Sequence, residues 1–151
     1  MRKLSLSVEC RHRRHDVQGL AAMRESKHFI LLVEDDPLMA DITAFRLELL
    51  GFDVQIVENS DAALRTCEEQ RVDLVIVDLE LAGMKGLELI NQLQIGESTH
   101  ETPIMVFSTD PNLDVVQKAF KAGAKDYLVT PYDPAMLEHK IAQLLSPESV
   151  T

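Results

Sequence analysis

The chain has 151 residues, of which 46% are hydrophobic and 26% are charged, and it contains two cysteines. This length is enough for one domain of ordinary size and too short for two full ones. Such a chain needs no disulfide or metal to hold a core, and Cys10 and Cys67 fit no metal or redox spacing. No apolar run approaches the roughly 20 residues of a membrane span. We therefore expect a single-domain cytoplasmic protein that does not bind membranes.

The net charge of −10 is unevenly distributed. Residues 1–27 hold seven basic and three acidic side chains, a net charge of +4, so the other 124 residues carry −14. A body this acidic argues against binding to nucleic acid. DNA binding by the basic segment is an open alternative, although the segment has no recognisable helix-turn-helix. We expect residues 1–27 to be a disordered extension, or to include translated sequence upstream of a start at Met23, and residues 147–151 to be a tail.

Five short apolar runs are typical of strands that are buried on both faces. A helix is predicted after each of them, and most of these helices begin with a residue suited to an N-cap. The strands are predicted at residues 29–33, 54–57, 74–77, 104–107 and 127–129. The helix starts are Asp36-Pro37, Ser60, a loop with Gly83 and Gly86, Asp110-Pro111, and Asp133-Pro134.

Apolar residues at spacings of three and four predict the buried faces of the helices. In the first helix this pattern consists of Leu38, Ile42, Phe45 and Leu49, followed by a stop at Gly51. Alternating strands and helices imply a parallel sheet that is covered by helices on both faces, with right-handed crossovers. In such sheets, ligands bind beyond the carboxyl ends of the strands.

Acidic residues gather at those predicted strand ends. Glu34, Asp35 and Asp36 follow the first strand, and Asp78 ends the third; Asp36 precedes a proline and is interpreted as a helix cap. Converging carboxylates repel one another and their pKa values rise unless a cation is present. Oxygen-only ligands in an open site suit Mg²⁺. A carboxylate beside that ion can attack a phosphorus atom and form an aspartyl phosphate.

Over residues 28 to about 146, the sequence resembles the receiver domain of two-component response regulators. The matching segments are ILLVEDDP at 30–37, DLVIVDLELAGMKGLE at 73–88, PIMVFST at 103–109 and GAKDYLVTPY at 123–132. The resemblance implies an α/β, flavodoxin-like (βα)5 fold, with a doubly wound parallel sheet of strand order 2-1-3-4-5.

The resemblance also implies the roles of the acidic residues. Asp78 would receive a phosphoryl group from a histidine of a sensor histidine kinase or phosphotransfer protein. Glu34, Asp35, Asp78 and the main-chain carbonyl of Glu80 would hold Mg²⁺. Such a protein is no enzyme, because it supports only its own phosphotransfer and dephosphorylation.

A switch and a docking face follow from the same resemblance. Ser108 matches the hydroxyl that turns toward the phosphoryl oxygen, and Tyr127 matches the aromatic residue whose ring then moves inward. The helix over residues 111–122, the fifth strand and the last helix would bind a downstream protein, and this face leaves homodimerisation open. Because only about five residues follow the last helix, we expect a stand-alone receiver.

Thr130 departs from the family pattern, which has a lysine directly before the proline of the fifth-strand turn. A lysine ammonium would contact Asp78 and then the phosphoryl group. Charge-assisted hydrogen bonds of this kind are worth about 1.5–3 kcal/mol. Lys125 lies five residues earlier, and strand geometry predicts that it cannot replace the missing charge.

Four further positions bear on the chemistry of the phosphoryl group. Ala82 stands where the family usually has a proline, and Lys85 where it usually has an acid. Glu80 and Asp110 flank the predicted site, and both are acidic. Because acids repel a phosphoryl group, we expect a lower affinity for phosphate analogues than is usual in the family.

Two alternatives to a phosphoacceptor remain. Thr130 favours a degenerate receiver, which would bind proteins independently of phosphorylation. An enzyme or flavin site on the same architecture is less consistent with the residues. The acidic loop after the first strand would repel a flavin phosphate, and the nearest match to the Asp-x-Asp motif of aspartyl phosphatases is Asp78-Leu79-Glu80, after the third strand.

Overall fold

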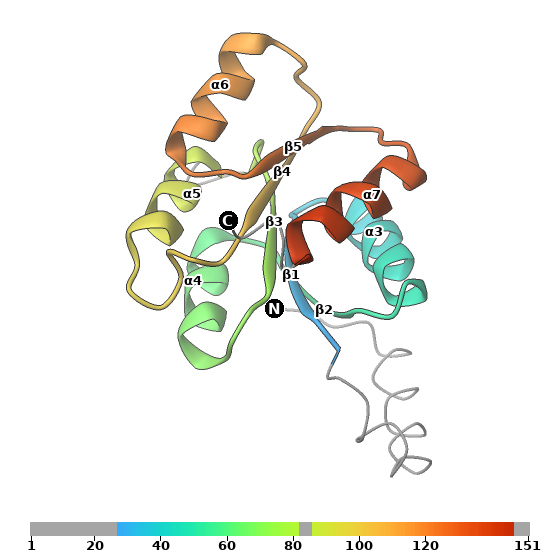
Figure 1. The fold of residues 1–151 in the computed structure, drawn as a ribbon, viewed down its shortest axis with the longest axis horizontal. Coiled ribbons are helices and arrows are strands. Elements are labelled where there is room, and N and C mark those ends of the chain that lie inside the picture. The colour runs from blue at the N-terminus through green and yellow to red at the C-terminus, as the bar shows by residue number, and fades with distance from the viewer. Residues whose placement is uncertain (1–26, 82–85, 147–151) are drawn as a thin grey trace, which may run out of the picture.

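A computed structural model of the chain describes residues 27–81 and 86–146. Nearly all of the predicted extension and the whole predicted tail lie outside these residues, so their disorder stays a prediction. Strands and helices alternate along the described chain (Figure 1). The strands are β1 (Phe29–Val33), β2 (Asp53–Val57), β3 (Leu74–Asp78), β4 (Ile104–Ser108) and β5 (Asp126–Val129). The helices are α3 (Pro37–Leu49), α4 (Ser60–Glu69), α5 (Gly86–Ile95), α6 (Leu113–Ala122) and α7 (Pro134–Leu145).

The five strands form one parallel sheet in the order β2-β1-β3-β4-β5. This is the predicted fold and strand order. Strand order reverses between β1 and β3, the point at which ligands bind in such sheets. The carboxyl ends of these two strands therefore define where the site lies.

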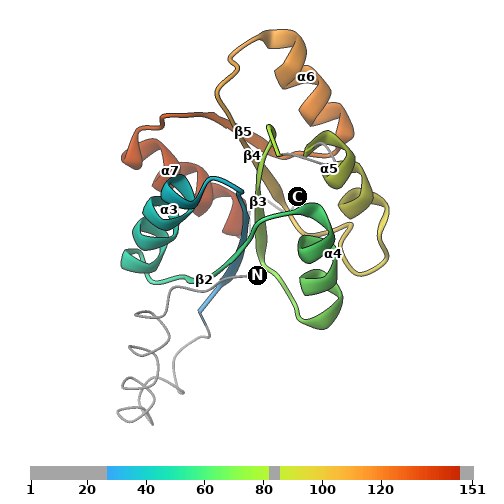
Figure 2. The same cartoon turned by 180° about the vertical axis from the view of Figure 1, so that it is seen from behind.

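Helices cover both faces of the sheet (Figures 1 and 2). Helices α4, α5 and α6 pack on one face, and α3 and α7 on the other. Along β1, Leu31 and Val33 face the first layer, whereas Ile30 and Leu32 face the second. The continuous apolar run thus reflects burial of the strand on both sides. None of the described helices combines the length and hydropathy of a membrane span.

The buried face predicted for α3 is wrong. The four residues predicted to be buried are 42–71% exposed, and a different set packs on the sheet. Helix α3 has apolar residues on most of its circumference, so their spacing fits two faces equally well. The helix buries mainly its smaller side chains, which lets it lie close to the sheet. The exposed residues are Leu38, Ile42, Phe45 and Leu49, and the buried ones are Ala40, Thr43, Ala44 and Leu47.

Two predicted helix starts are displaced by one or two residues. Asn59 caps α4, because its side chain accepts the Ala62 N–H at 2.8 Å. Asn112 caps α6, and Asp110 instead accepts the Asn112 N–H at 2.9 Å in the preceding turn. An asparagine within a few residues of a predicted cap is itself a preferred N-cap. The caps predicted at Asp36 and Asp133 are confirmed.

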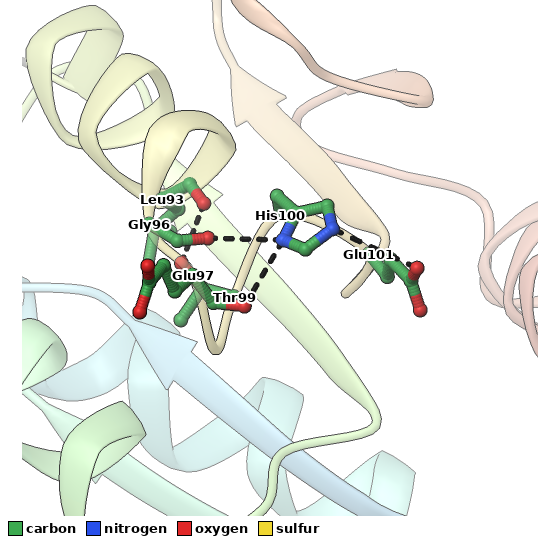
Figure 3. Close-up of polar contacts among 6 residues, drawn as sticks. All are labelled: Leu93, Gly96, Glu97, Thr99, His100 and Glu101. Atoms are coloured by element: carbon green, nitrogen blue, oxygen red, sulfur yellow. Dashed lines mark hydrogen bonds and ion pairs between the residues drawn. The ribbon is translucent and has the colours of Figure 1, made fainter.

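The end of α5 is closed by side chains of the turn that leads to β4 (Figure 3). Thr99 Oγ1 donates to the Leu93 carbonyl at 2.5 Å. The Nδ1–H of His100 lies 3.1 and 3.0 Å from the carbonyl oxygens of Gly96 and Glu97, which accept it. Helix ends leave such carbonyls without partners inside the helix. These bonds fix the start of β4 at the sheet edge opposite the carboxyl ends.

Candidate functional site

Three carboxylates meet at the carboxyl edge of the sheet. Glu34 and Asp35 directly follow β1, and Asp78 is the last residue of the neighbouring β3. The register pairs Val33 with Val77, so Glu34 and Asp78 continue adjacent strands. One carboxylate oxygen from each of the three acids lies within 4.8 Å of the others. The structure therefore brings together the three side chains predicted to bind Mg²⁺.

Two carboxyl groups of this cluster, Glu34 and Asp78, have raised pKa values. Glu34 is only 5% exposed, and burial, together with the hydrogen bond to Asp78 and repulsion by its charge, raises the pKa of Glu34 to about 8. Burial also raises the pKa of Asp78. Both shifts arise because charge is unfavourable in a poorly hydrated site. A divalent cation would offset the same cost and displace the proton.

The loop after β3 is fastened to the sheet on both sides of Asp78. The Leu79 N–H donates to the Phe107 carbonyl at 2.8 Å, and the Glu80 N–H donates to Asp78 Oδ1 at 3.0 Å. At Gly86, an added Cβ would lie 2.8 Å from the Leu79 Cα, so a side chain there would push the loop away. These contacts fix Glu80 beside Asp78. A role of the Glu80 main-chain carbonyl as a metal ligand stays a prediction.

The side chain of Glu80 contacts the predicted switch hydroxyl. Ser108 is fully buried, and its Oγ donates to Glu80 Oε2 at 2.5 Å. The other Glu80 oxygen, Oε1, accepts the Thr109 N–H at 3.3 Å. Glu80 was predicted to bind the metal through its main-chain carbonyl and to flank the site as an acid, but the contact of its side chain with Ser108 was not predicted. The contact could have been expected from the pairing of Asp78 with Phe107, because this pairing brings the segments that follow β3 and β4 close together.

Tyr127 lies with its ring inward and is linked to Ser108 through Asp110. The tyrosine is 8% exposed, and its hydroxyl donates to the Asp110 main-chain oxygen at 2.6 Å. The Asp110 N–H in turn donates to Ser108 Oγ at 3.0 Å. Burial raises the pKa of Tyr127, so the phenol stays a donor at neutral pH. A continuous path of hydrogen bonds therefore runs from Glu80 through Ser108 and Asp110 to Tyr127.

Comparison with known proteins assigns this arrangement to a family. The model of the response regulator receiver domain matches residues 30–142. The chain belongs to this family. Receiver domains are signalling modules of two-component systems rather than classical enzymes, and they bind Mg²⁺ at an acidic pocket. They interact with histidine kinases or phosphotransfer proteins and with downstream targets.

Individual relatives agree with this assignment. The receiver is 30% identical to the heme response regulator HssR of Staphylococcus aureus (strain Newman) over 115 residues. These residues cover 76% of this chain and 50% of that protein. The chain thus spans about half the length of the curated relatives it matches.

Two solved structures illustrate the similarity of the fold. A putative response regulator from Chloroflexus aurantiacus J-10-fl has a TM-score of 0.77 and 27% identity, with 80% of this chain and 98% of that chain covered. The receiver domain of the sensor histidine kinase PA1611 from Pseudomonas aeruginosa PAO1 has a TM-score of 0.74, 27% identity and the same coverage. That structure contains a magnesium ion coordinated in its active site cleft.

Thr130 is the residue predicted to stand where the family has a lysine. The residue is 9% exposed, its N–H donates to the Ser108 carbonyl at 2.8 Å, and its peptide bond to Pro131 is cis. Lys125 lies at the opposite end of the sheet, where its N–H donates to the carbonyl of Ile104, the first residue of β4. The prediction that Lys125 does not replace the missing ammonium is therefore consistent with its position.

Three other residues were predicted to affect the chemistry of the phosphoryl group, and only one of them is described by the structure. Ala82 and Lys85 lie outside the described residues, so their effect on the site stays a prediction. Asp110 is described, and its main chain joins Ser108 to Tyr127. Its contribution to the site includes these backbone bonds as well as its charge.

Proposed function

We propose that Asp78 accepts a phosphoryl group from the phosphohistidine of a sensor histidine kinase or phosphotransfer protein, in a reaction that requires Mg²⁺. The observation that supports this most strongly is the cluster of Glu34, Asp35 and Asp78, whose oxygens lie within 4.8 Å of one another. The raised pKa of Glu34, to about 8, supports it further, because it indicates a site that favours a cation.

The donor set fits a magnesium ion. Glu34, Asp35, Asp78 and the main-chain carbonyl of Glu80 offer only oxygen atoms, as Mg²⁺ prefers. Bound Mg²⁺ would neutralise charge on the carboxylates and on the phosphoryl oxygens. The magnesium ion in the PA1611 receiver, which is 27% identical, supports the same assignment here.

Phosphotransfer at Asp78 is a substitution at phosphorus. An Asp78 carboxylate oxygen forms a bond to the phosphorus while the bond to the histidine nitrogen breaks. The leaving nitrogen keeps the electron pair and takes up a proton. Asp78 is suited to attack because its position at the end of β3 leaves it partly exposed, whereas Glu34 is buried beside it.

The output of this reaction is a change in protein docking. Ser108 would donate its hydrogen bond to a phosphoryl oxygen, and Tyr127 would transmit the change to the surface of α6, β5 and α7. This surface carries exposed apolar side chains, among them Leu113, Phe120 and Val129, which are 66, 43 and 40% exposed. We propose that a downstream protein binds there.

Residues 28–146 form the signalling unit in this proposal, and residues 1–27 are a basic extension. The family match over residues 30–142 supports these bounds. A cytoplasmic location fits the free thiol of Cys67, because reducing compartments maintain unpaired cysteines.

A receiver that signals without phosphorylation is the second candidate. Thr130 supplies no charge where the family has a lysine, and Tyr127 already lies inward. Both observations favour a docking surface that is already formed without a phosphoryl group on Asp78.

The mass of the intact protein after incubation with acetyl phosphate and Mg²⁺ separates the two candidates. We expect one phosphoryl adduct, which is absent in Asp78→Asn and present in the matched control Asp61→Asn, an exposed residue of α4. If an ordinary receiver is labelled under the same conditions and this chain is not, the phosphoacceptor proposal is wrong and the second candidate takes its place.

A further inference from the structure

Glu80 places an anion on the switch hydroxyl of the unphosphorylated protein. Its Oε2 accepts the Ser108 hydroxyl at 2.5 Å, and its Oε1 accepts the Thr109 N–H at 3.3 Å. The carboxylate is thus bound through both oxygens to the end of β4. A hydroxyl donating to an anionic oxygen forms a charge-assisted hydrogen bond, which is shorter and stronger than a neutral one.

Ser108 and Tyr127 both bind the main chain of Asp110. The hydroxyl that donates to Glu80 also accepts the Asp110 N–H at 3.0 Å, which holds the main chain of Asp110 next to Ser108. The Asp110 carbonyl, in the next peptide group along the chain, accepts the Tyr127 hydroxyl at 2.6 Å. Tyr127 is held with only 8% of its surface exposed, at the side of β5 that packs against α5 and α6.

We propose that Glu80 is a positioning residue that stands in for the phosphoryl group: its carboxylate holds Ser108 and Tyr127 in the inward arrangement before Asp78 is phosphorylated. This inference rests on the proposed function, in which a phosphoryl oxygen on Asp78 is the anion that Ser108 binds. Phosphorylation of Asp78 then exchanges one anionic acceptor of the Ser108 hydroxyl for another. Because the ring of Tyr127 already lies inward, the change in docking that phosphorylation produces is smaller than it would be for a ring that must first move inward.

Two features of Glu80 fit this role. The residue lies two positions after Asp78, and its own N–H donates to Asp78 Oδ1 at 3.0 Å, so the acid that binds Ser108 is held next to the predicted phosphoacceptor. Its side chain also reaches Ser108 without displacing the backbone bond of Leu79 to Phe107. Thr130 carries no ammonium group. The Glu80 carboxylate is therefore not drawn away from Ser108 by a positive charge at position 130.

The two tyrosines of the chain make the inference measurable. Tyr127 and Tyr132 are the only ones in the sequence, so the full-length protein labelled with 3-fluorotyrosine gives two ¹⁹F NMR signals, which Tyr127→Phe assigns. Tyr132 packs against Phe107, with ring centroids 5.4 Å apart, and its hydroxyl lies 2.9 Å from Thr43 Oγ1. Tyr132 packs on the face of the sheet that α3 and α7 cover, whereas Tyr127 packs on the other face, so Tyr132 serves as an internal reference.

We expect Glu80→Ala to move the Tyr127 signal toward that of an exposed tyrosine and to leave the Tyr132 signal in place. Ser108→Ala should move it in the same way, and the double variant should move it no further, because both residues act through one path. Glu69→Ala, an exposed glutamate at the end of α4, is the matched control and should change neither signal. Acetyl phosphate with Mg²⁺ should return the Tyr127 signal of Glu80→Ala to its wild-type position.

An unchanged Tyr127 signal in Glu80→Ala would overturn the inference, as would a wild-type signal that already reports an exposed ring. The same samples are weighed for the phosphoryl adduct. If the adduct forms but the Tyr127 signal is the same in Glu80→Ala and in the wild type, the inference alone is wrong. If no adduct forms but Tyr127 still depends on Glu80, the proposed phosphotransfer is wrong and the positioning role of Glu80 stands.

Discussion

The carboxyl groups of Glu34 and Asp78 lie at the ends of neighbouring parallel strands, with one oxygen of each within 4.8 Å of the other. Burial is the largest cause of the raised pKa of both groups. Proton and cation therefore compete for the same oxygens. This competition ties the chemistry of the site to pH and to stability in ways that can be measured.

Magnesium affinity should rise with pH until Glu34 is ionised. The pKa of Glu34 is about 8, and the ion binds the deprotonated carboxylate, so affinity increases between about pH 6 and 8 and then levels off. Calorimetric titrations in buffers with different ionisation enthalpies should show proton release below that pH. Glu34→Gln should bind weakly with no such dependence; a wild-type affinity that is constant over this range would contradict the role of Glu34.

Stability without magnesium should depend on pH in the opposite direction. Between the usual pKa of a glutamate and about 8, the folded protein keeps a proton on Glu34 that the unfolded chain has lost. Because the folded state then binds more protons, the free energy of unfolding falls as pH rises through this range. Urea unfolding in the presence of a chelator should show the fall. We expect Asp78→Asn, which removes the repulsive charge, to flatten the curve and to stabilise the protein at pH 8.

A lysine at position 130 should strengthen phosphotransfer. Thr130 lies beside Ser108 through its main-chain bond, and an ammonium there would add a charge-assisted hydrogen bond to the phosphoryl group. We expect Thr130→Lys to raise the rate of labelling by acetyl phosphate about tenfold, since 1.4 kcal/mol corresponds to that factor. Thr130→Met, which adds length without charge, should give no increase, and an equal gain in both variants would show that charge is not the cause.

Removing the charge of Glu80 should also speed labelling. The carboxylate lies within hydrogen-bonding distance of the hydroxyl that is proposed to receive the phosphoryl oxygen, so it repels the incoming group. Glu80→Gln keeps the shape of the side chain and should raise the labelling rate about fivefold, close to the effect of two unit charges 4 Å apart in water. Slower labelling in Glu80→Gln would mean that the acid assists the transfer.

The packing of α3 has a direct test in stability. Leu47 is fully buried, whereas Phe45 is 54% exposed. Truncation of a buried leucine to alanine removes core contacts and leaves a cavity, so Leu47→Ala should reduce the free energy of unfolding by about 2–5 kcal/mol. Phe45→Ala should cost less than about 1 kcal/mol. If urea titrations show that Phe45→Ala costs more stability than Leu47→Ala, the buried face predicted from the spacing would be correct.

The sheet and the acidic cluster could be predicted because both follow from strong local signals. In a chain where strands and helices alternate, a continuous apolar run such as residues 30–33 predicts a buried strand. Acids placed directly after neighbouring parallel strands must meet at one edge of the sheet. Helix α3 was ambiguous because its apolar residues extend around most of its surface, and the structure buries Ala44 and Leu47 rather than the larger Phe45.

The contact between Glu80 and Ser108 depends on the path of a loop, which no periodic pattern records. Glu80 stands two residues beyond β3, where the strand register no longer dictates the direction of a side chain. The position of Gly86 against Leu79 helps to set that path, and nothing in the spacing of these residues shows it. The order of the strands was predictable, whereas the acceptor of the switch hydroxyl was not.

The most direct test of phosphotransfer identifies the modified residue chemically. The full-length protein is incubated with acetyl phosphate and Mg²⁺ and then treated with borohydride, which reduces an aspartyl phosphate to homoserine. Peptide mass spectrometry should find homoserine at position 78, and only when Mg²⁺ is present. Homoserine at another position, or none in a sample where a known receiver is converted, would contradict the assignment of Asp78 as the phosphoacceptor.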